Sequence, residues 1–199
     1  MKLSAVILAG GQSLRMGRDK AWLEVEGQSL LGRAAETARS MGVEEIFISG
    51  RAGVDYSALK FPVLLDLESG YGPLGGIERG LDAAGSPLLL VLAVDLPQMT
   101  TAFLQKLFDH CDSQTGAVPQ LAGALEPLAA IYPKRCHALA MECLAGGRRA
   151  AREFAVACLR ENAVKLFPVA ASDEALFANC NSPADLPPIP PQFGPRDPA

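Results

Sequence analysis

The sequence predicts an α/β fold built on a mostly parallel β-sheet that helices cover on both faces. Two observations lead to this prediction. Apolar runs of strand length alternate with segments of helical spacing, and the runs are apolar at nearly every position rather than at every second one. Strands of that kind are buried on both sides, as they are in parallel sheets. A chain of 199 residues can bury such a core in one domain.

The first half of the chain has the clearer pattern. Gly42 suits the end of a helix because glycine readily adopts the left-handed conformation there. Thr100 or Thr101 is expected to cap a later helix. In chain order we predict a strand at 3–8, a helix at 30–41, strands at 45–49 and 63–65, a helix at 76–84, a strand at 88–94 and a helix ending at 110.

The second half is less regular. We predict strands at 116–119, 127–132 and 163–169, and helices at 135–144 and 148–159. Ser182 and Pro183 are expected to begin a short helix, as N-cap and first-turn residue. We therefore place one domain over 1–186. The remaining 187–199 contain six prolines in thirteen residues and are expected to be a disordered tail.

Charge and composition exclude several classes of protein. The net charge is −4 and the isoelectric point about 5.2, which argues against a nucleic-acid partner. No apolar run approaches the roughly 20 residues of a membrane span, so we expect no membrane partner. The five cysteines form no C-x-x-C pair and no signal peptide precedes the domain, which favours a reduced, cytoplasmic protein.

A glycine-rich, basic loop follows the first predicted strand. Gly10, Gly11 and Gly17 allow close approach of the backbone, and Arg15 and Lys20 add positive charge. Bare N–H groups and cations at the end of a strand suit a polyphosphate, although a tight turn would also use these glycines. The spacing is neither a Walker A loop nor the Rossmann G-x-G-x-x-G pattern. Arg15 and Lys20 are thus candidate catalytic residues.

Two carboxylates close predicted parallel strands. Asp66 follows 63–65, and Asp95 follows 88–94. Because ligands of such sheets bind beyond the carboxyl ends of the strands, both should meet the glycine loop at one edge. Asp95 is either a helix-capping group or a ligand of Mg²⁺, which takes one or two carboxylates plus phosphate oxygens. Asp66 could bind a ribose or base equally well.

Further loops offer weaker signals. The segment Gly70-Tyr71-Gly72-Pro73-Leu74-Gly75-Gly76 is a plain turn or the second wall of a cleft. Arg148 and Arg149 begin a predicted helix and form either a second anion site or an exposed basic surface. His110 and His137 lack ligand-like partners and are expected to be structural or solvated.

Several segments together resemble the molybdenum cofactor guanylyltransferases, the MobA family of the nucleotidyltransferase superfamily. The resemblance spans about residues 3 to 186. It rests on these segments: Leu8-Ala9-Gly10-Gly11-x-Ser13-x-Arg15-Met16-Gly17-x-Asp19-Lys20, Gly72-Pro73-Leu74-x-Gly76, Asp95-x-Pro97, Glu126-Pro127-Leu128 and Asn179-x-Asn181-Ser182-Pro183-x-Asp185-Leu186.

The resemblance implies a Rossmann-like three-layer α/β/α sandwich of the nucleotide-diphospho-sugar transferase type. It also implies transfer of GMP from GTP to molybdenum-bound molybdopterin, release of pyrophosphate, and Mg²⁺ as cofactor. The residues it implies are, for the nucleotide, Leu8, Ala9, Gly10, Gly11, Lys20, Asp66 and Asp95; for the metal, Asp95; and for the pterin, Gly72, Gly76, Asn179 and Asn181.

One feature of the sequence favours guanine as the base, and one residue departs from the guanylyltransferase pattern. Gly10-Gly11 favours guanine, since cytidylyltransferase relatives usually carry Leu-Ala-Ala-Gly at this loop. Ser49 stands where guanylyltransferases often have asparagine. Two alternatives stay open: a CTP- or sugar-phosphate-specific enzyme of the same fold, and a non-catalytic protein that binds or delivers the cofactor. Molybdoenzymes or their chaperones are possible further partners.

Overall fold

The computed structural model describes residues 1–10, 20–65 and 70–180. Its centre is an eight-stranded sheet in the order β10-β7-β9-β6-β1-β4-β5, with β8 paired to β7. The strands of this sheet are β1 (Leu3–Leu8), β4 (Glu45–Gly50), β5 (Val63–Leu65), β6 (Leu88–Ala93), β7 (Gly116–Leu121), β8 (Ala124–Leu125), β9 (Ala129–Pro133) and β10 (Val164–Pro168). A separate hairpin joins β2 (Glu24–Val25) to β3 (Gln28–Ser29).

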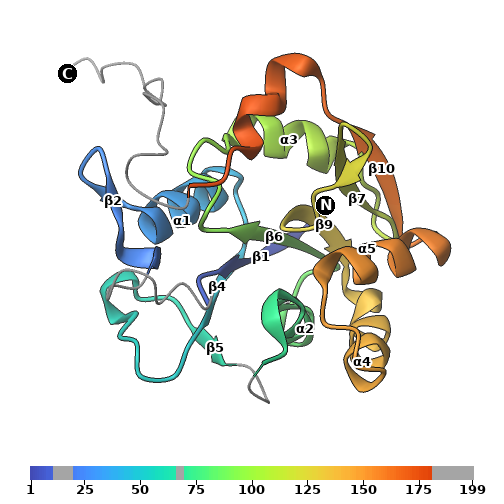
Figure 1. The fold of residues 1–199 in the computed structure, drawn as a ribbon, viewed down its shortest axis with the longest axis horizontal. Coiled ribbons are helices and arrows are strands. Elements are labelled where there is room, and N and C mark those ends of the chain that lie inside the picture. The colour runs from blue at the N-terminus through green and yellow to red at the C-terminus, as the bar shows by residue number, and fades with distance from the viewer. Residues whose placement is uncertain (11–19, 66–69, 181–199) are drawn as a thin grey trace.

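Helices form a layer on each face of the sheet. Figure 1 shows α1 and α3 on one side and α2, α4 and α5 on the other, which confirms the three-layer prediction. The helices are α1 (Leu30–Ser40), α2 (Gly72–Ala83), α3 (Thr101–Asp109), α4 (His137–Ala145) and α5 (Ala151–Arg160). Short 3₁₀ helices cover Lys20–Trp22, Ser57–Leu59, Lys134–Cys136 and Ala171–Phe177. Within these described parts of the chain, no helix has the length and apolar character needed to cross a membrane.

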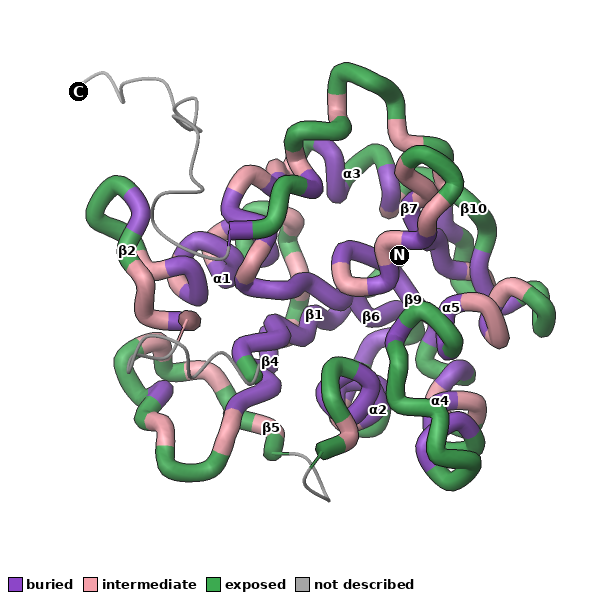
Figure 2. Tube along the Cα trace, in the orientation of Figure 1, coloured by how far each residue is buried: buried purple, intermediate pink, exposed green. Residues whose placement is uncertain are grey.

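The central strand β6 shows why its sequence is apolar throughout. Leu88, Leu90 and Leu92 pack into the core under α1 and α3, whereas Leu89 and Val91 pack into the core under α2, α4 and α5. Both faces of the strand are therefore buried, and Figure 2 shows the sheet as a buried centre. Each fully buried leucine contributes about 1.5–3 kcal/mol relative to an exposed one, so this strand anchors both halves of the core.

Strand direction gathers the functional loops at one edge. β4, β1 and β6 are parallel neighbours, and β5 is parallel to β4, so all four end at the same edge. β9 runs antiparallel to both β6 and β7, whereas β10 is again parallel to β7. The sheet is mostly parallel, as predicted, but the antiparallel insertion of β9 was not predicted. β9 therefore begins, rather than ends, at the functional edge.

Capping groups fix several helix ends. The Ser29 hydroxyl accepts a hydrogen bond from the Gly32 N–H (3.0 Å) at the start of α1, and Gly42 has a φ of +70° just after its end. At α3 the Thr100 hydroxyl accepts from the Phe103 N–H (3.2 Å). Thr100 rather than Thr101 is thus the cap of α3.

Two predicted helix starts were wrong by several residues. α2 begins at Gly72 rather than at 76, because Pro73 fits the first turn, where its missing N–H is not needed. α5 begins at Ala151 rather than at 148. The Arg148 N–H donates instead to the Cys143 carbonyl (2.9 Å) and closes the end of α4. The predicted helix at 182 and the proline-rich tail lie outside the described residues.

Candidate active site

The chain turns at the carboxyl ends of β1, β4 and β6 are tied together by backbone hydrogen bonds. The Ser49 carbonyl accepts from the N–H groups of Ala9 (2.9 Å) and Gly10 (3.1 Å). The Val94 N–H donates to the Leu8 carbonyl (3.2 Å). These bonds hold the first part of the glycine loop in a fixed position, with Gly10 exposed at the edge.

Lys20 and Asp95 meet at this edge, although 75 positions separate them in the sequence. Lys20 begins the 3₁₀ helix Lys20–Trp22, and its Nζ lies 3.6 Å from Asp95 Oδ2. Their side chains are 15% and 31% exposed, respectively. A partly exposed ion pair of this kind contributes about 0–1 kcal/mol to stability. Stability alone therefore gives little reason for placing these charges here. The sequence predicted that the glycine loop, Asp66 and Asp95 would gather at one edge; the structure brings Lys20, at the end of that loop, to Asp95, and Asp66 lies outside the described residues.

The segment that contains Asn179 reaches the same place. The Cys180 N–H donates to the Asp95 carbonyl (2.9 Å), which ties the end of the described chain to the end of β6. Asn179, the preceding residue, is exposed. Asn179 thus lies beside Asp95 along this contact, and its contact with a pterin stays a prediction.

Arg149 holds the second glycine-rich loop. Its Nη1 donates to the Gly70 carbonyl (3.2 Å), and its guanidinium carbon lies 5.9 Å from the centre of the Tyr71 ring. Gly70 and Gly72 have φ values of +89° and +61°, a conformation that favours glycine. The sequence left the role of Arg149 open, since a contact between the α4–α5 turn and residue 70 has no local signal.

Gly76 lies inside the interface between α2 and the sheet. A Cβ at this position would stand 2.2 Å from Ser49 Oγ and 2.8 Å from Leu8 Cδ2. Glycine is therefore required here by the close packing of α2 on β1 and β4. Its predicted pterin contact is not needed to account for the residue and stays a prediction.

Glu126 is a site residue to which the sequence assigned no role of its own. It lies in the turn before β9, and its pKa is raised by burial, lowered by Arg152 and raised by Asp95. The Arg152 Nη2 donates to the neighbouring Leu125 carbonyl (3.4 Å). The Asp95 and Glu126 carboxylates are thus close enough to repel each other.

Four predicted site residues lie outside the described residues. They are Gly11, Arg15, Asp66 and Asn181. The structure places the residues that precede three of them. Gly10 and Leu65 lie at or next to the ends of β1 and β5 at the functional edge, and Cys180 is hydrogen-bonded to the Asp95 carbonyl. Their predicted roles stay predictions.

The two histidines have structural partners. His137 Nε2 lies 2.8 Å from the Oε1 of Glu78, a buried residue of α2. The His110 ring packs edge-on against Phe167, with the ring centres 5.5 Å apart. In the parts of the chain that the structure describes, no group of three or more His, Cys, Asp or Glu side chains could hold a metal ion.

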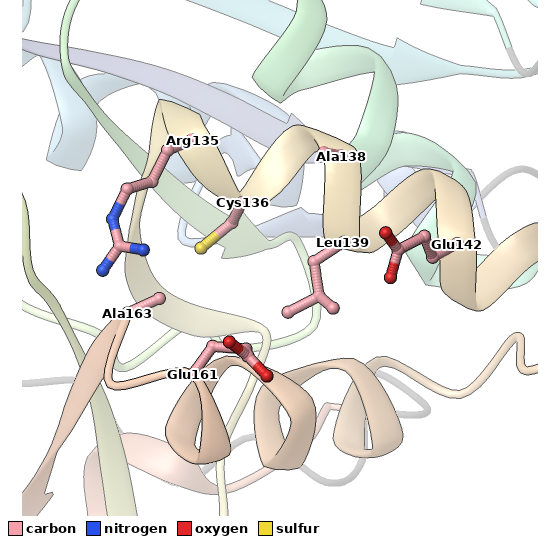
Figure 3. Close-up of a pocket in the computed structure, with 7 residues that line it drawn as sticks. All are labelled: Arg135, Cys136, Ala138, Leu139, Glu142, Glu161 and Ala163. Atoms are coloured by element: carbon pink, nitrogen blue, oxygen red, sulfur yellow. The ribbon is translucent and has the colours of Figure 1, made fainter.

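A separate hollow of about 350 Å³ lies between the start of α4 and the end of α5 (Figure 3). Arg135 on its wall donates hydrogen bonds to the carbonyls of Gln114 (3.1 Å) and Asn162 (3.2 Å). Its side chain therefore connects these two backbone segments. The hollow follows the end of β9, and Pro133 there is paired with Leu88 at the start of β6. It is thus at the opposite edge of the sheet from Asp95.

Comparison with known proteins adds a family and a fold. Residues 5–163 match the family model described as "MobA-like NTP transferase domain". The "Probable molybdenum cofactor guanylyltransferase" of Opitutus terrae is 37% identical over 186 residues, which cover 92% of this chain and 92% of that protein. A protein of the same name from Pelotomaculum thermopropionicum is 34% identical and covers 94% of this chain and 91% of its own.

A solved structure of similar shape carries a related name. "Molybdopterin-guanine dinucleotide biosynthesis protein A" from Archaeoglobus fulgidus superposes with a TM-score of 0.70 at 22% identity, over 92% of this chain and 94% of that one. At that level of identity the likeness shows the shared fold.

Proposed function

The chain belongs to the MobA-like NTP transferase family, and on that basis we propose that it transfers GMP from GTP to a molybdopterin-type cofactor. The products are the guanine dinucleotide form of the cofactor and pyrophosphate. The observation that carries the proposal is the contact between Lys20 and Asp95 at the carboxyl edge of the sheet. The relatives of this chain are named for the same reaction.

The nucleophile is the terminal phosphate of the pterin. Its second pKa lies near ~6, so it is largely dianionic at neutral pH and needs no general base. One of its oxygens bonds to the α-phosphorus of GTP, and the bond from that phosphorus to the oxygen bridging to the β-phosphate breaks. The electron pair leaves with pyrophosphate. This route agrees with a site in which both histidines have structural partners elsewhere.

The residues act by position and charge. Lys20 stabilises the negative charge that develops on the α-phosphate and on the departing pyrophosphate, and Arg15 is proposed to do the same. The N–H groups of the glycine loop orient the phosphates. Both substrates are anions, so neutralising their repulsion is the main task of the site.

The edge of the sheet also fits a divalent cation. Its described donor is the Asp95 carboxylate, which is partly exposed at the edge beside the Lys20 ammonium. Mg²⁺ typically uses one or two carboxylates and completes its shell with water and phosphate oxygens, which agrees with the lack of a larger protein ligand group among the described residues. Asp95 would hold Mg²⁺, which supplies Lewis-acid neutralisation of the phosphate charge.

The test is pyrophosphate release with each of the four nucleoside triphosphates, with and without molybdopterin. We expect release with GTP and molybdopterin together, and an Asp95→Asn variant gives the background. Release with CTP instead would show the alternative base specificity. Binding of the cofactor with no release under any condition would replace the proposal with a delivery protein.

Location and downstream partners follow from the same proposal. All five cysteines are free and buried, a state typical of a protein kept under reducing conditions. We propose that the protein works in the cytoplasm and that its product passes to a molybdoenzyme or its chaperone.

A further inference from the structure

Arg51 is a partly exposed arginine at the functional edge, directly after β4. The last residues that pair between β1 and β4 are Leu8 and Ser49. Two positions beyond this pair, Gly10 and Arg51 lie side by side, because Arg51 Cγ is 3.5 Å from the place that a Cβ on Gly10 would occupy. The stem of the Arg51 side chain therefore lies against the first part of the glycine loop.

The missing side chain of Gly10 leaves room for a ligand beside Arg51. Among residues 1–10, 20–65 and 70–180, and apart from the chain neighbours of Gly10, no atom lies closer than 3.5 Å to the place of its Cβ. This is an ordinary van der Waals distance, whereas a Cβ on Gly76 would clash with Ser49 Oγ. Packing of the described chain therefore does not demand a glycine at position 10. Close approach of a ligand to this exposed backbone accounts for it.

Aromatic residues fix the backbone of Arg51. The Arg51 N–H donates to the Tyr56 hydroxyl (3.2 Å). The Tyr56 ring is buried and packs so closely on Gly50 that a Cβ there would clash with it. The same ring stacks with Trp22, with the ring centres 6.1 Å apart, and Trp22 ends the 3₁₀ helix that begins with Lys20. The positions of Arg51 and Lys20 are thus linked through two aromatic rings.

The place of Arg51 along the sheet fits the base of a nucleotide rather than its phosphates. The chain runs from β1 to β4 and β5 on one side and then crosses to β6 on the other side of β1. Ligands of such sheets bind at this crossing point, where Lys20 and Asp95 lie. Arg51 follows β4, which lies two strand spacings, or roughly 10 Å, from β6. A GTP with its α-phosphate at Lys20 can therefore extend its base toward Arg51.

The hydrogen-bonding groups of guanine match those of an arginine side chain. Guanine presents two adjacent acceptors, O6 and N7, to the paired N–H groups of a guanidinium. Cytosine presents an amino donor at N4, and adenine presents one at N6, so each would set a donor against a donor. We propose that Arg51 selects guanine by donating hydrogen bonds to O6 and N7 of GTP. This inference rests on the proposed function, which supplies GTP as the substrate.

The experiment measures the Kd of the whole protein for GTP and for 7-deaza-GTP by isothermal titration calorimetry, with Mg²⁺ and without pterin. 7-Deaza-GTP carries a C–H group in place of N7 and so lacks one of the two acceptors. We expect the wild type to bind 7-deaza-GTP about 10-fold more weakly than GTP. Arg51→Ala should bind GTP about 10- to 100-fold more weakly than the wild type does. It should bind the two nucleotides within about twofold of each other, since the group that reads N7 is gone.

Two further variants separate paired hydrogen bonds from charge and from folding. Arg51→Lys keeps the charge but lacks the planar pair of donors, so it should recover only part of the affinity for GTP. Arg160→Ala removes an exposed arginine at the end of α5, beside the hollow at the opposite edge of the sheet, and should leave both Kd values unchanged. Thermal melting shows whether each variant is folded.

The outcomes distinguish the inference from its premise. A wild type that binds CTP more tightly than GTP would contradict the proposed function and the inference together. If the wild type prefers GTP and Arg51→Ala weakens GTP and 7-deaza-GTP by the same factor, Arg51 contacts the phosphates or the ribose. The selection of guanine by Arg51 is then overturned, and the proposed function stands. An unchanged Kd for GTP in Arg51→Ala, or full recovery in Arg51→Lys, also overturns the inference alone.

Discussion

At the scale of single residues, the pairing of Lys20 with Asp95 is the most informative contact. The 3.6 Å separation holds the ammonium and carboxylate groups at the same edge, where each can exchange its partner for a substrate group. Asp95 can turn to a cation and Lys20 to a phosphate oxygen without movement of the strands. The pair is therefore a prearranged charge site, which is what reactions between two anions require.

Replacing Lys20 with alanine tests this arrangement. We expect kcat/KM to fall about 100-fold, or about 3 kcal/mol in transition-state stabilisation, as when one prearranged donor is lost. The thermal midpoint should change little, because the ion pair contributes little to stability. Lys2→Ala is the matched control, since Lys2 pairs with Glu44 in an exposed contact remote from the site. A loss below tenfold would exclude Lys20 from the reaction.

Gly76 is a residue whose absent side chain matters. Gly76→Ala would bring its Cβ within 2.2 Å of Ser49 Oγ and force α2 away from β1 and β4. Overpacking of this kind costs about 1–3 kcal/mol, to be measured by chemical denaturation. Adding Ser49→Ala removes the nearest clash and should recover part of the loss. An unchanged unfolding free energy for Gly76→Ala would contradict the packing role.

At the scale of elements, the turn between α4 and α5 supports the loop before α2. The Arg149 side chain donates to the Gly70 carbonyl, and the predicted pterin residue Gly72 follows two positions later as the first residue of α2. Without this contact the loop would sample more conformations. The loss should therefore appear mainly in the binding of the second substrate.

Arg149→Ala is expected to raise the KM for the pterin substrate several-fold and leave the KM for GTP within twofold. Steady-state kinetics with each substrate varied in turn measures both constants. Arg148→Ala is the neighbouring control. The Arg148 backbone N–H closes the end of α4, and alanine keeps this bond. An equal rise in both constants would argue that Arg149 supports the whole fold rather than this loop.

Across the whole molecule, the parts that the sequence predicted are those with a local signal. The uninterrupted apolar runs indicated buried parallel strands, and Asp95 directly after one of them placed a carboxylate at the edge. Contacts between distant segments carry no such signal. Two examples are the antiparallel direction of β9 and the hydrogen bond from Arg149 to the Gly70 carbonyl. Both depend on the assembled sheet and could not be predicted from sequence patterns alone.

The edge of the sheet opposite the site is closed by one carboxylate. Glu45 Oε2 accepts hydrogen bonds from Ser4 Oγ (2.8 Å) and from the Gly85 N–H (2.8 Å), and Ser4 Oγ in turn accepts from the Ser86 N–H (3.3 Å). Glu45 therefore links the start of β4, the start of β1 and the turn before β6. The Gly85 N–H, followed by the Ser4 hydroxyl, lowers the pKa of Glu45 below its ordinary value of 4.5.

This network predicts a specific sensitivity to acid. Because the pKa of Glu45 is lowered by folding, its stabilising effect is complete above the pKa of the unfolded chain and is lost as pH falls through the folded-state pKa. Glu45→Gln should therefore be less stable than the wild type at neutral pH, and the difference should shrink below about pH 4, near the ordinary glutamate pKa. Urea denaturation across pH measures it, with Glu44→Gln as the exposed neighbour. If the difference in unfolding free energy between the two proteins stays constant with pH, Glu45 acts by packing rather than by charge. Ionisation of Glu45 would then not contribute to joining the three segments.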